Sequence, residues 1–189
     1  MRTVYVVGYP GSGKSTLVGN TLTALGAMSA VQVDAPVPHL RYNGIRGVPT
    51  RMWEIGRRRD SFSGTDALAM NIQPKAVAWV SGLNDGDAVS VLFGEGDRLA
   101  NLGFLTACPE LILVHLDVPV AVAQARAAQR AAHLGRSPQN DSWWKGRVTK
   151  TKNLISMIEG VREVVRIDGM TDPVTASEQL VNELAERVR

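Results

Sequence analysis

The stretch Gly8-Tyr9-Pro10-Gly11-Ser12-Gly13-Lys14-Ser15, followed by Thr16, matches the pattern G-x-x-x-x-G-K-[ST] of a phosphate-binding loop. Its glycines let backbone N–H groups turn around phosphate oxygens, and the helix that follows adds the positive end of its dipole. In this pattern Lys14 contacts the β- and γ-phosphates, and the hydroxyl of Ser15 ligates Mg²⁺. Residues 10–16 are therefore the predicted nucleotide site, with ATP and Mg²⁺ as cofactors.

The residues on both sides of the loop have the pattern that the motif requires. Residues 3–7 are a short run of β-branched and aromatic residues, which predicts a strand. Residues 15–25 carry apolar side chains at helical spacing. A Gly-rich turn that binds nothing is a weaker interpretation, because the strand, the lysine, the serine and the helix occur together.

Strands and helices alternate along the rest of the chain. Further strands are predicted at 29–33, 88–93, 111–116 and 164–167, and helices at 51–59, 66–70, 74–83, 99–106, 119–134, 143–158 and 172–188. This alternation predicts a three-layer α/β fold with a five-stranded, all-parallel sheet flanked by helices. We expect one domain, residues 1–189, with an insert at about 35–85 that opens with a long Pro- and Gly-rich loop.

Composition excludes several classes of protein. Apolar residues make up 44% and charged residues 21%, which is ordinary for a globular chain. No apolar run is long enough to cross a membrane, and the first strand follows Met1-Arg2 directly, so we expect no signal peptide and a cytoplasmic protein. The single cysteine, Cys108, excludes an intramolecular disulfide, and the three histidines lack the spacing of a zinc site.

Positive charge is concentrated in residues 41–60 and 126–152, whereas the chain from residue 159 onward is net negative. Two basic internal segments indicate ligands rich in phosphate, nucleic acid among them. Solvated loops and helix faces are the alternative interpretation.

Acidic residues follow the predicted strands. Asp34, Glu95, Asp97, Asp117 and Asp168 all stand at or just after strand ends. Because the carboxyl ends of parallel strands meet at one edge of a sheet, we expect these carboxylates to converge near the loop. A carboxylate there can orient an acceptor hydroxyl or a metal-bound water. For Asp34, structural capping of the strand is an equally good account.

Together these features resemble the nucleoside monophosphate kinase group of P-loop kinases, over nearly the whole chain. Besides the loop, residues 111–119 followed by Arg126 and Arg130 look like that group's fourth strand and the helix that enters its lid. The resemblance implies transfer of the γ-phosphate of ATP, with a lid at about 133–147. It implies that Arg126 and the loop at Asp168 hold ATP, and that Arg130 and Arg136 neutralise phosphate charge. A GTPase is disfavoured because the chain has no Asn-Lys-x-Asp.

The acceptor side has several candidate residues. Asp97-Arg98 resembles the Asp-Arg of thymidylate kinases, and Glu95 resembles the strand-end glutamate of deoxynucleoside kinases. The first resemblance implies that Arg98 holds an acceptor phosphate, and polynucleotide kinases have an aspartate in the position of Asp34. Asp66 can also face an acceptor hydroxyl, although helix capping by the neighbouring threonine explains that segment as well.

Residues 53–68 and 137–150 also resemble phage-encoded P-loop kinases, some of which phosphorylate 5-hydroxymethyluracil in DNA. This implies a hydroxymethyl acceptor in phage DNA, in the cytoplasm of a host bacterium. It also implies DNA contacts through basic and aromatic side chains: Arg57, Arg58, Arg59, Trp143, Trp144, Lys145 and Arg147. Core packing is the alternative role for the tryptophans. The alternative functions are a free deoxynucleoside monophosphate kinase and a nucleic-acid-binding ATPase.

Overall fold

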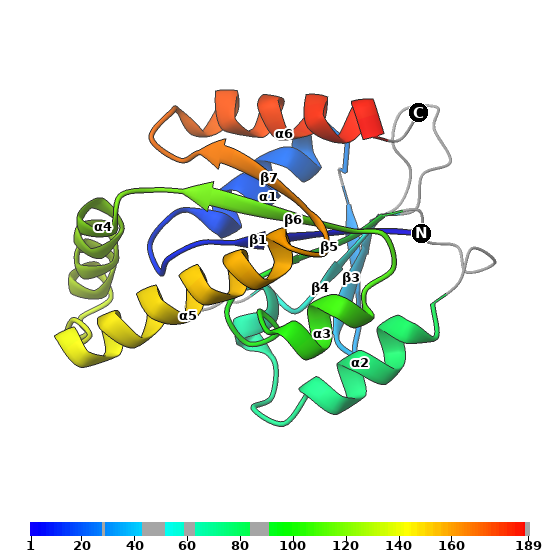
Figure 1. Ribbon diagram of the computed structural model, residues 1–189, viewed down its shortest axis with the longest axis horizontal. Helices are drawn as coiled ribbons and strands as arrows, with labels where there is room; N and C mark the ends of the chain where they lie inside the picture. Colours follow the sequence, from blue (N-terminus) through cyan, green and yellow to red (C-terminus); the bar gives the residue numbers. More distant parts are fainter. Residues whose placement is uncertain (28, 43–51, 59–62, 84–90, 188–189) are drawn as a thin grey trace.

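A computed structural model describes residues 1–27, 29–42, 52–58, 63–83 and 91–187. Its strands are β1 (Arg2–Val7), β2 (Ala30–Val33), β3 (His39–Tyr42), β4 (Met52–Ile55), β5 (Val91–Glu95), β6 (Leu111–Asp117) and β7 (Glu163–Asp168). Its helices are α1 (Lys14–Ala24), α2 (Gln73–Ser81), α3 (Leu102–Ala107), α4 (Val120–His133), α5 (Asp141–Glu159) and α6 (Pro173–Arg187), with a 3₁₀ helix, η1 (Gly64–Ala67). The elements form three layers, with α1 and α6 on one face of the sheet and α2, α3 and α5 on the other (Figure 1).

The sheet has seven strands in the order β2-β3-β4-β5-β1-β6-β7. The strands from β4 to β7 in this order are parallel, whereas β3 is antiparallel to both β2 and β4. The α/β fold is therefore confirmed. The prediction of a five-stranded sheet that is parallel throughout is wrong, because residues 39–42 and 52–55 add two strands and the first of them, β3, runs antiparallel to both of its neighbours.

The place beside β5 is taken by residues 52–55, for which the sequence predicts a helix. That prediction is wrong, and the burial pattern shows why. Met52 packs in the cluster on the α1 face, while Trp53 and Ile55 pack in the cluster on the opposite face. Alternation between two buried faces is the period of a strand, and a strand buried on both sides shows little polar alternation in its sequence.

The central strand β1 delivers the phosphate-binding loop to the middle of the sheet edge. Val4 and Val6 pack on the α1 face, and Tyr5 and Val7 pack on the other face, all of them buried. Strand β1 lies between β5 and β6, so the turns that follow those two strands flank the loop. This sheet order determines which segments can reach a ligand on the loop.

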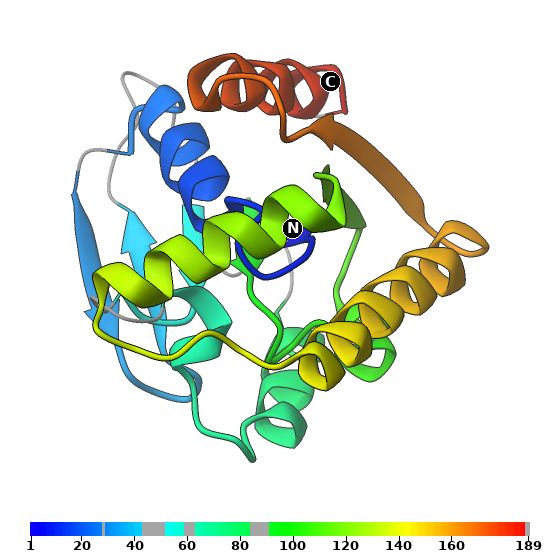
Figure 2. The same cartoon turned by 90° about the vertical axis from the view of Figure 1, so that its left-hand side faces the viewer.

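Helices α4 and α5 are joined by residues 134–140, and α4 and the start of α5 lie beyond the end of the sheet (Figure 1). Figure 2 shows α4 crossing in front of the loop that follows β1. A Cβ atom at Gly11 would lie 2.3 Å from the carbonyl oxygen of Ala123, so α4 packs directly on the loop backbone. The predicted helices at 119–134 and 143–158, with a polar break between them, are confirmed. No helix in the described part of the chain has the length and apolarity needed to cross a membrane.

Candidate active site

The phosphate-binding loop depends on glycine at positions where its backbone turns or approaches a neighbour. Gly11 has φ +81° and Gly13 has φ +99°, in the left-handed region that favours glycine. A Cβ atom at Gly8 would lie 2.8 Å from Ser12 Oγ and 2.9 Å from the carbonyl oxygen of Leu116. Gly13 is the N-cap of α1, so the loop ends at a helix N-terminus, which favours anions.

Lys14 lies against the inside of this loop. Its Nζ donates to the carbonyl oxygens of Gly8 and Tyr9, each at 3.0 Å. Burial lowers the pKa of Lys14, and the positive charge of Arg130 lowers it further, while the negative charges of Glu95 and Asp66 raise it. The lysine therefore stands between the loop and two acidic side chains, and Arg130 on α4 is close enough to affect its charge.

Ser15 forms a hydrogen bond with the last residue of β5. Its hydroxyl donates to Glu95 Oε1 at 2.9 Å. Ser63, just before η1, donates to Ser15 Oγ at 2.9 Å and to Glu95 Oε1 at 3.3 Å. The Oγ atoms of Ser15 and Ser63 and the Oε1 atom of Glu95 therefore lie close to one another at the start of α1, although they come from three separate segments of the chain.

Glu95 is the most perturbed carboxyl group of this site. It is buried, and burial raises its pKa to about 7, with further increases from the negative charges of Asp66 and Glu54. Lys14 and the hydrogen bond from Ser15 oppose that increase. A carboxyl group with a pKa close to neutrality can both accept and release a proton under ordinary conditions.

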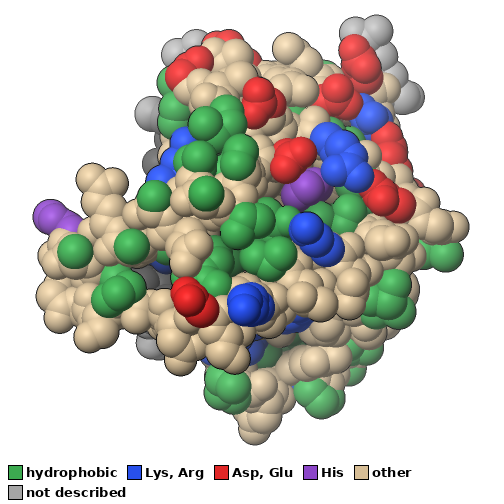
Figure 3. Space-filling model, turned by 60° about the vertical axis from the view of Figure 1, so that its left-hand side comes forward, with side chains coloured by type: hydrophobic (Ala, Val, Ile, Leu, Met, Phe, Trp, Pro, Cys, Tyr) green, Lys and Arg blue, Asp and Glu red, His purple; other side chains and the backbone are tan. Residues whose placement is uncertain are grey.

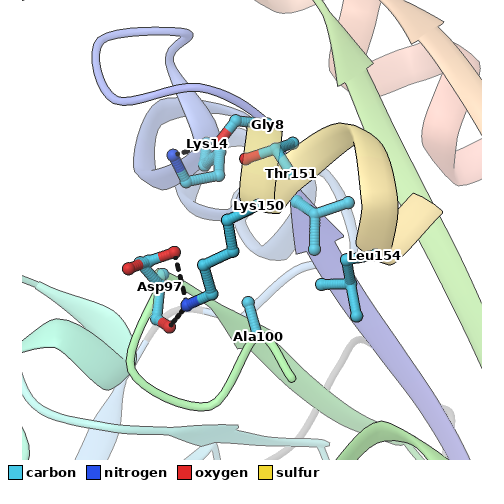
Figure 4. Close-up of a pocket in the computed structure, with 9 residues that line it drawn as sticks. Gly8, Lys14, Asp97, Ala100, Lys150, Thr151 and Leu154 are labelled. Atoms are coloured by element: carbon cyan, nitrogen blue, oxygen red, sulfur yellow. Dashed lines mark hydrogen bonds and ion pairs between the residues drawn. The ribbon is translucent and has the colours of Figure 1, made fainter. Parts of the chain in front are cut away.

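Asp66 and Asp97 hold the turn that follows β5. Asp66 Oδ1 accepts hydrogen bonds from the backbone N–H groups of Asp97 at 2.8 Å and Arg98 at 3.0 Å. Asp97 pairs with Arg147 and, at 2.9 Å, with Lys150, both on α5. In Figure 4, Lys150 extends from α5 towards Asp97. Asp66 thus caps the turn through its own side chain.

A pocket lies between the loop, this turn and α5. Its lining includes Gly8, Lys14, Asp97, Lys150 and Thr151 (Figure 4). Arg98 reaches the back of the turn, where its Nη2 donates to the carbonyl oxygen of Asp66 at 3.4 Å. Its Nε is buried without a hydrogen-bond partner among the described residues. Glu95 and Asp97 therefore lie near Lys14, as expected from their strand-end positions, whereas Arg98 lies on the other side of the turn.

Asp34 stands apart from this group. Its carboxylate pairs with Arg57 at 2.8 Å. It follows the edge strand β2, and both β3 and β4 lie between β2 and β5. Since neighbouring strands are about 4.8 Å apart, Asp34 lies more than two strand spacings from the end of β5.

The predicted ATP contacts at the far side of the loop lie on α4 and after β7. Arg126 Nη1 donates to the carbonyl oxygen of Gly169 at 3.3 Å, which connects α4 to that turn. Asp168 Oδ1 accepts the N–H of Met170 at 2.8 Å, and a second pocket includes Asp168 and Met170 in its lining. Arg136 follows the end of α4, where its backbone N–H donates to the carbonyl oxygen of Ala131 at 2.8 Å.

The residues predicted to contact DNA are largely engaged within the protein. Trp144 is only 5% exposed and belongs to the core cluster on the α1 face. Trp143 is half-buried beneath the guanidinium of Arg147, while Lys145 is exposed. Arg58 donates to Tyr42 and Glu54, Arg57 to Asp34, and Arg59 lies outside the described residues. Figure 3 shows basic, acidic and hydrophobic side chains interspersed on the face that it presents.

Sequence reasoning missed two side chains at the site, Ser63 and Lys150. Neither belongs to a motif, and both reach the site only because the sheet order brings their segments to the end of β5. The signal for Ser63 was the Gly64 that follows it, since a glycine there indicates a close backbone approach. The signal for Lys150 was its spacing from Arg147, which places both on one face of α5.

A family model described as P-loop Nucleotide Kinase3 matches residues 1–185 of the chain. A deoxyadenosine kinase from M. mycoides has a similar structure, with a TM-score of 0.53 and 14% identity over 97% of this chain and 99% of that one. A gluconokinase from Sinorhizobium meliloti 1021 has a TM-score of 0.55 and 18% identity, covering 99% and 95% of the two chains. A sugar kinase from Janibacter sp. has a TM-score of 0.54 and 15% identity, covering 98% and 95%. No curated protein matches the chain.

Proposed function

This chain belongs to the P-loop Nucleotide Kinase3 family, and from that premise we propose that it transfers the γ-phosphate of ATP to a hydroxyl group of a nucleotide-type acceptor. One observation carries the proposal. Ser15 Oγ and Glu95 Oε1 lie 2.9 Å apart, next to Lys14 and the loop backbone. A hydroxyl, a carboxylate and an ammonium group thus surround the place where the loop would hold the γ-phosphate.

The residues present fit ATP and Mg²⁺. The left-handed glycines and the N-terminus of α1 suit phosphate oxygens, and the oxygen atoms of Ser15 and Glu95 are the hard donors that Mg²⁺ prefers. Bound Mg²⁺ supplies neutralisation of the charge on the β- and γ-phosphates. Lys14, Arg130 and Arg136 are the side chains of this chain that we assign to the remaining phosphate charge, and Arg126 and Asp168 are assigned to the base-binding end.

Glu95 is the carboxylate best placed to hold Mg²⁺ together with Ser15, because its Oε1 accepts the Ser15 hydroxyl at 2.9 Å. In the ligand-free protein its pKa is raised to about 7 by burial, so a proton would compete with the ion for this group near neutral pH. Asp97 is held in ion pairs by Arg147 and Lys150 on α5. Asp66 is used in capping the turn, so its contribution is positional.

The structure supports one of the two acceptors that the sequence suggests more strongly than the other. A hydroxymethyl group in DNA, which the resemblance to phage kinases favours, needs free basic and aromatic side chains beside the pocket. Trp144 is buried, and Arg57, Arg58 and Arg147 are bonded to acidic groups. A free nucleotide does not need such an extended basic and aromatic surface. The geometry therefore supports a free nucleotide acceptor more strongly, and hydroxymethyl-DNA is the alternative.

The test supplies labelled ATP and Mg²⁺ with a panel of nucleosides and nucleoside monophosphates, with DNA containing 5-hydroxymethyluracil, and with unmodified DNA. We expect label on a free nucleotide, in the wild type and in Lys75→Ala, whose exposed lysine lies on α2. Label on modified DNA alone would establish the alternative acceptor. Release of phosphate without any labelled acceptor would contradict the kinase proposal and indicate a nucleic-acid-binding ATPase.

A further inference from the structure

Ser63 does not belong to the phosphate-binding loop, but its hydroxyl group lies beside that loop. Its hydroxyl oxygen lies 2.9 Å from Ser15 Oγ and 3.3 Å from Glu95 Oε1, and those two oxygens are themselves 2.9 Å apart. Ser63 is separated from Ser15 by 48 positions and from Glu95 by 32. The tertiary fold therefore brings together a triangle of hard oxygen atoms.

The size of this triangle matches one face of a magnesium coordination shell. Mg²⁺ binds oxygen at about 2.0–2.1 Å in near-octahedral geometry, so two neighbouring ligands are separated by about 2.9 Å. The three oxygen–oxygen separations between Ser15, Glu95 and Ser63 are 2.9, 2.9 and 3.3 Å. Hydroxyl and carboxylate oxygens are also the donor types that suit this ion.

The backbone that carries Ser63 is fixed in place by contacts that only glycine permits. Gly64 has φ +61°, and a Cβ atom there would lie 2.3 Å from Glu95 Oε1. On its other side, a Cβ atom at Gly56 would lie 2.1 Å from the carbonyl oxygen of Gly64. The backbone N–H of Arg57 also donates to that oxygen at 3.2 Å. The segment around Gly64 is therefore packed between Glu95 and the residues that follow β4.

The two residues after Gly64 hold the segment at its other end. Thr65 is fully buried, and its Oγ1 lies 3.1 Å from the hydroxyl of Tyr5 on β1. Asp66 accepts the N–H groups that follow β5. Ser63 is thus presented by a segment anchored to β1, β4 and β5, which is the kind of rigid support that a metal ligand needs.

We propose that Ser63 is the third protein oxygen of the Mg²⁺·nucleotide site, together with Ser15 and Glu95. This inference rests on the proposed function and deepens it, because it makes the acceptor-side insert part of the metal site. A nucleotide bound on the loop and the segment that faces the acceptor would then share one ion. Loss of the Ser63 hydroxyl should weaken metal binding even when no acceptor is present.

Metal binding can be measured without turnover. The wild type, Ser63→Ala, Ser15→Ala and Ser81→Ala are titrated with Mn²⁺ in the presence of AMP-PNP, and free Mn²⁺ is followed by electron paramagnetic resonance. Ser81 is exposed at the end of α2, so its variant is the matched control. We expect about tenfold or greater loss of Mn²⁺ affinity in Ser63→Ala, a loss at least as large in Ser15→Ala, and none in Ser81→Ala.

The outcomes separate the two proposals. If Ser15→Ala loses affinity and Ser63→Ala does not, the role of Ser63 is overturned while the nucleotide site stands. If the wild type holds no more Mn²⁺ than AMP-PNP alone, both are overturned.

A second variant guards against misfolding. Ser63→Cys replaces the hydroxyl group with a thiol, which is a soft ligand. The ratio of Cd²⁺ affinity to Mg²⁺ affinity should therefore rise by at least tenfold relative to the wild type and to Ser81→Cys. An unchanged preference in a variant with a native melting temperature would overturn the assignment.

Discussion

Ser15 at the start of α1 donates a hydrogen bond to Glu95 at the end of β5, with 2.9 Å between the two oxygens. In the proposed site, this bond connects the nucleotide-binding loop to the segment assigned to the acceptor. The first half is a local motif, while the second comes from a strand 80 positions further along the chain. Because both groups are oxygen donors beside Lys14, the bond marks the point at which phosphate, metal and acceptor would meet.

Removing the ammonium group of Lys14 should abolish phosphoryl transfer. Lys14 lies against the loop carbonyls and beside Glu95, so Lys14→Ala removes the charge closest to the transferring phosphate. We expect a fall in kcat of about 10²-fold or more, as for other preorganised electrostatic groups. Steady-state kinetics with ATP and the acceptor identified by labelling measure this, with Lys75→Ala as the control. Activity within a few-fold of wild type would contradict the assignment of the loop.

Glu95 should give the rate a dependence on pH. Because the pKa of Glu95 is raised to about 7 in the ligand-free protein, the ionised form that would bind Mg²⁺ is lost below that pH. We expect kcat/KM to rise between pH 6 and pH 8 in the wild type. Glu95→Gln should be about 10²-fold slower and lack this rise, because a neutral amide holds Mg²⁺ more weakly and does not titrate. A Gln variant with the same pH profile as wild type would remove Glu95 from that role.

The same group should make the stability of the ligand-free protein depend on pH. The folded pKa of Glu95, about 7, lies above its ordinary value of 4.5, so the folded state binds more protons than the unfolded state in this interval. The stabilisation that Glu95 contributes is fully present below its ordinary pKa and is lost as the pH rises through 7. The change is about 3 kcal/mol, at about 1.4 kcal/mol per pKa unit. Urea unfolding of wild type and Glu95→Gln at pH 5 and pH 8 measures it, and equal slopes with pH would contradict it.

Gly64 should tolerate no side chain. Alanine there would meet Glu95 Oε1 at 2.3 Å and would adopt φ +61°, so Gly64→Ala must displace the segment that carries Ser63. We expect a loss of about 1–3 kcal/mol in the free energy of unfolding, with a loss of activity. The matched control is Gly19→Ala in α1, where a Cβ atom meets nothing within 4 Å and should be neutral or stabilising by about 0.5–1 kcal/mol. Equal unfolding energies for both variants would contradict this account.

The neighbouring tryptophans of α5 should behave differently. Trp144 is 5% exposed in the core, so Trp144→Ala should cost about 3–5 kcal/mol of the free energy of unfolding. Trp143 is only half-buried and stacks with Arg147, so Trp143→Ala should cost about 1 kcal/mol. Chemical denaturation compares the two, and a larger loss for Trp143 would show that the helix is rotated relative to this arrangement.

The sequence by itself determined the phosphate-binding loop and the buried strands on either side of it. Those features are local, because left-handed glycines and a helix N-terminus need only adjacent residues, and β1, β5 and β6 are marked by runs of mainly apolar residues. Glu95, Asp97 and Arg98 were also found from sequence, since they follow a strand whose carboxyl end is directed to the same edge as the loop. Their assigned roles remain predictions that the experiments above address.

Tertiary structure alone decided which other segments lie beside these three residues. Residues 52–55 become a strand because both of their faces are buried, which no local pattern shows, and their insertion beside β5 moves Asp34 to the edge of the sheet. Burial likewise assigns Trp144 to the core. Ser63 contacts Glu95, and Lys150 contacts Asp97. Each contact joins segments that are far apart in the chain and meet only in the folded protein. The physical reason is that a local sequence fixes backbone conformation, whereas strand order and burial depend on the whole chain.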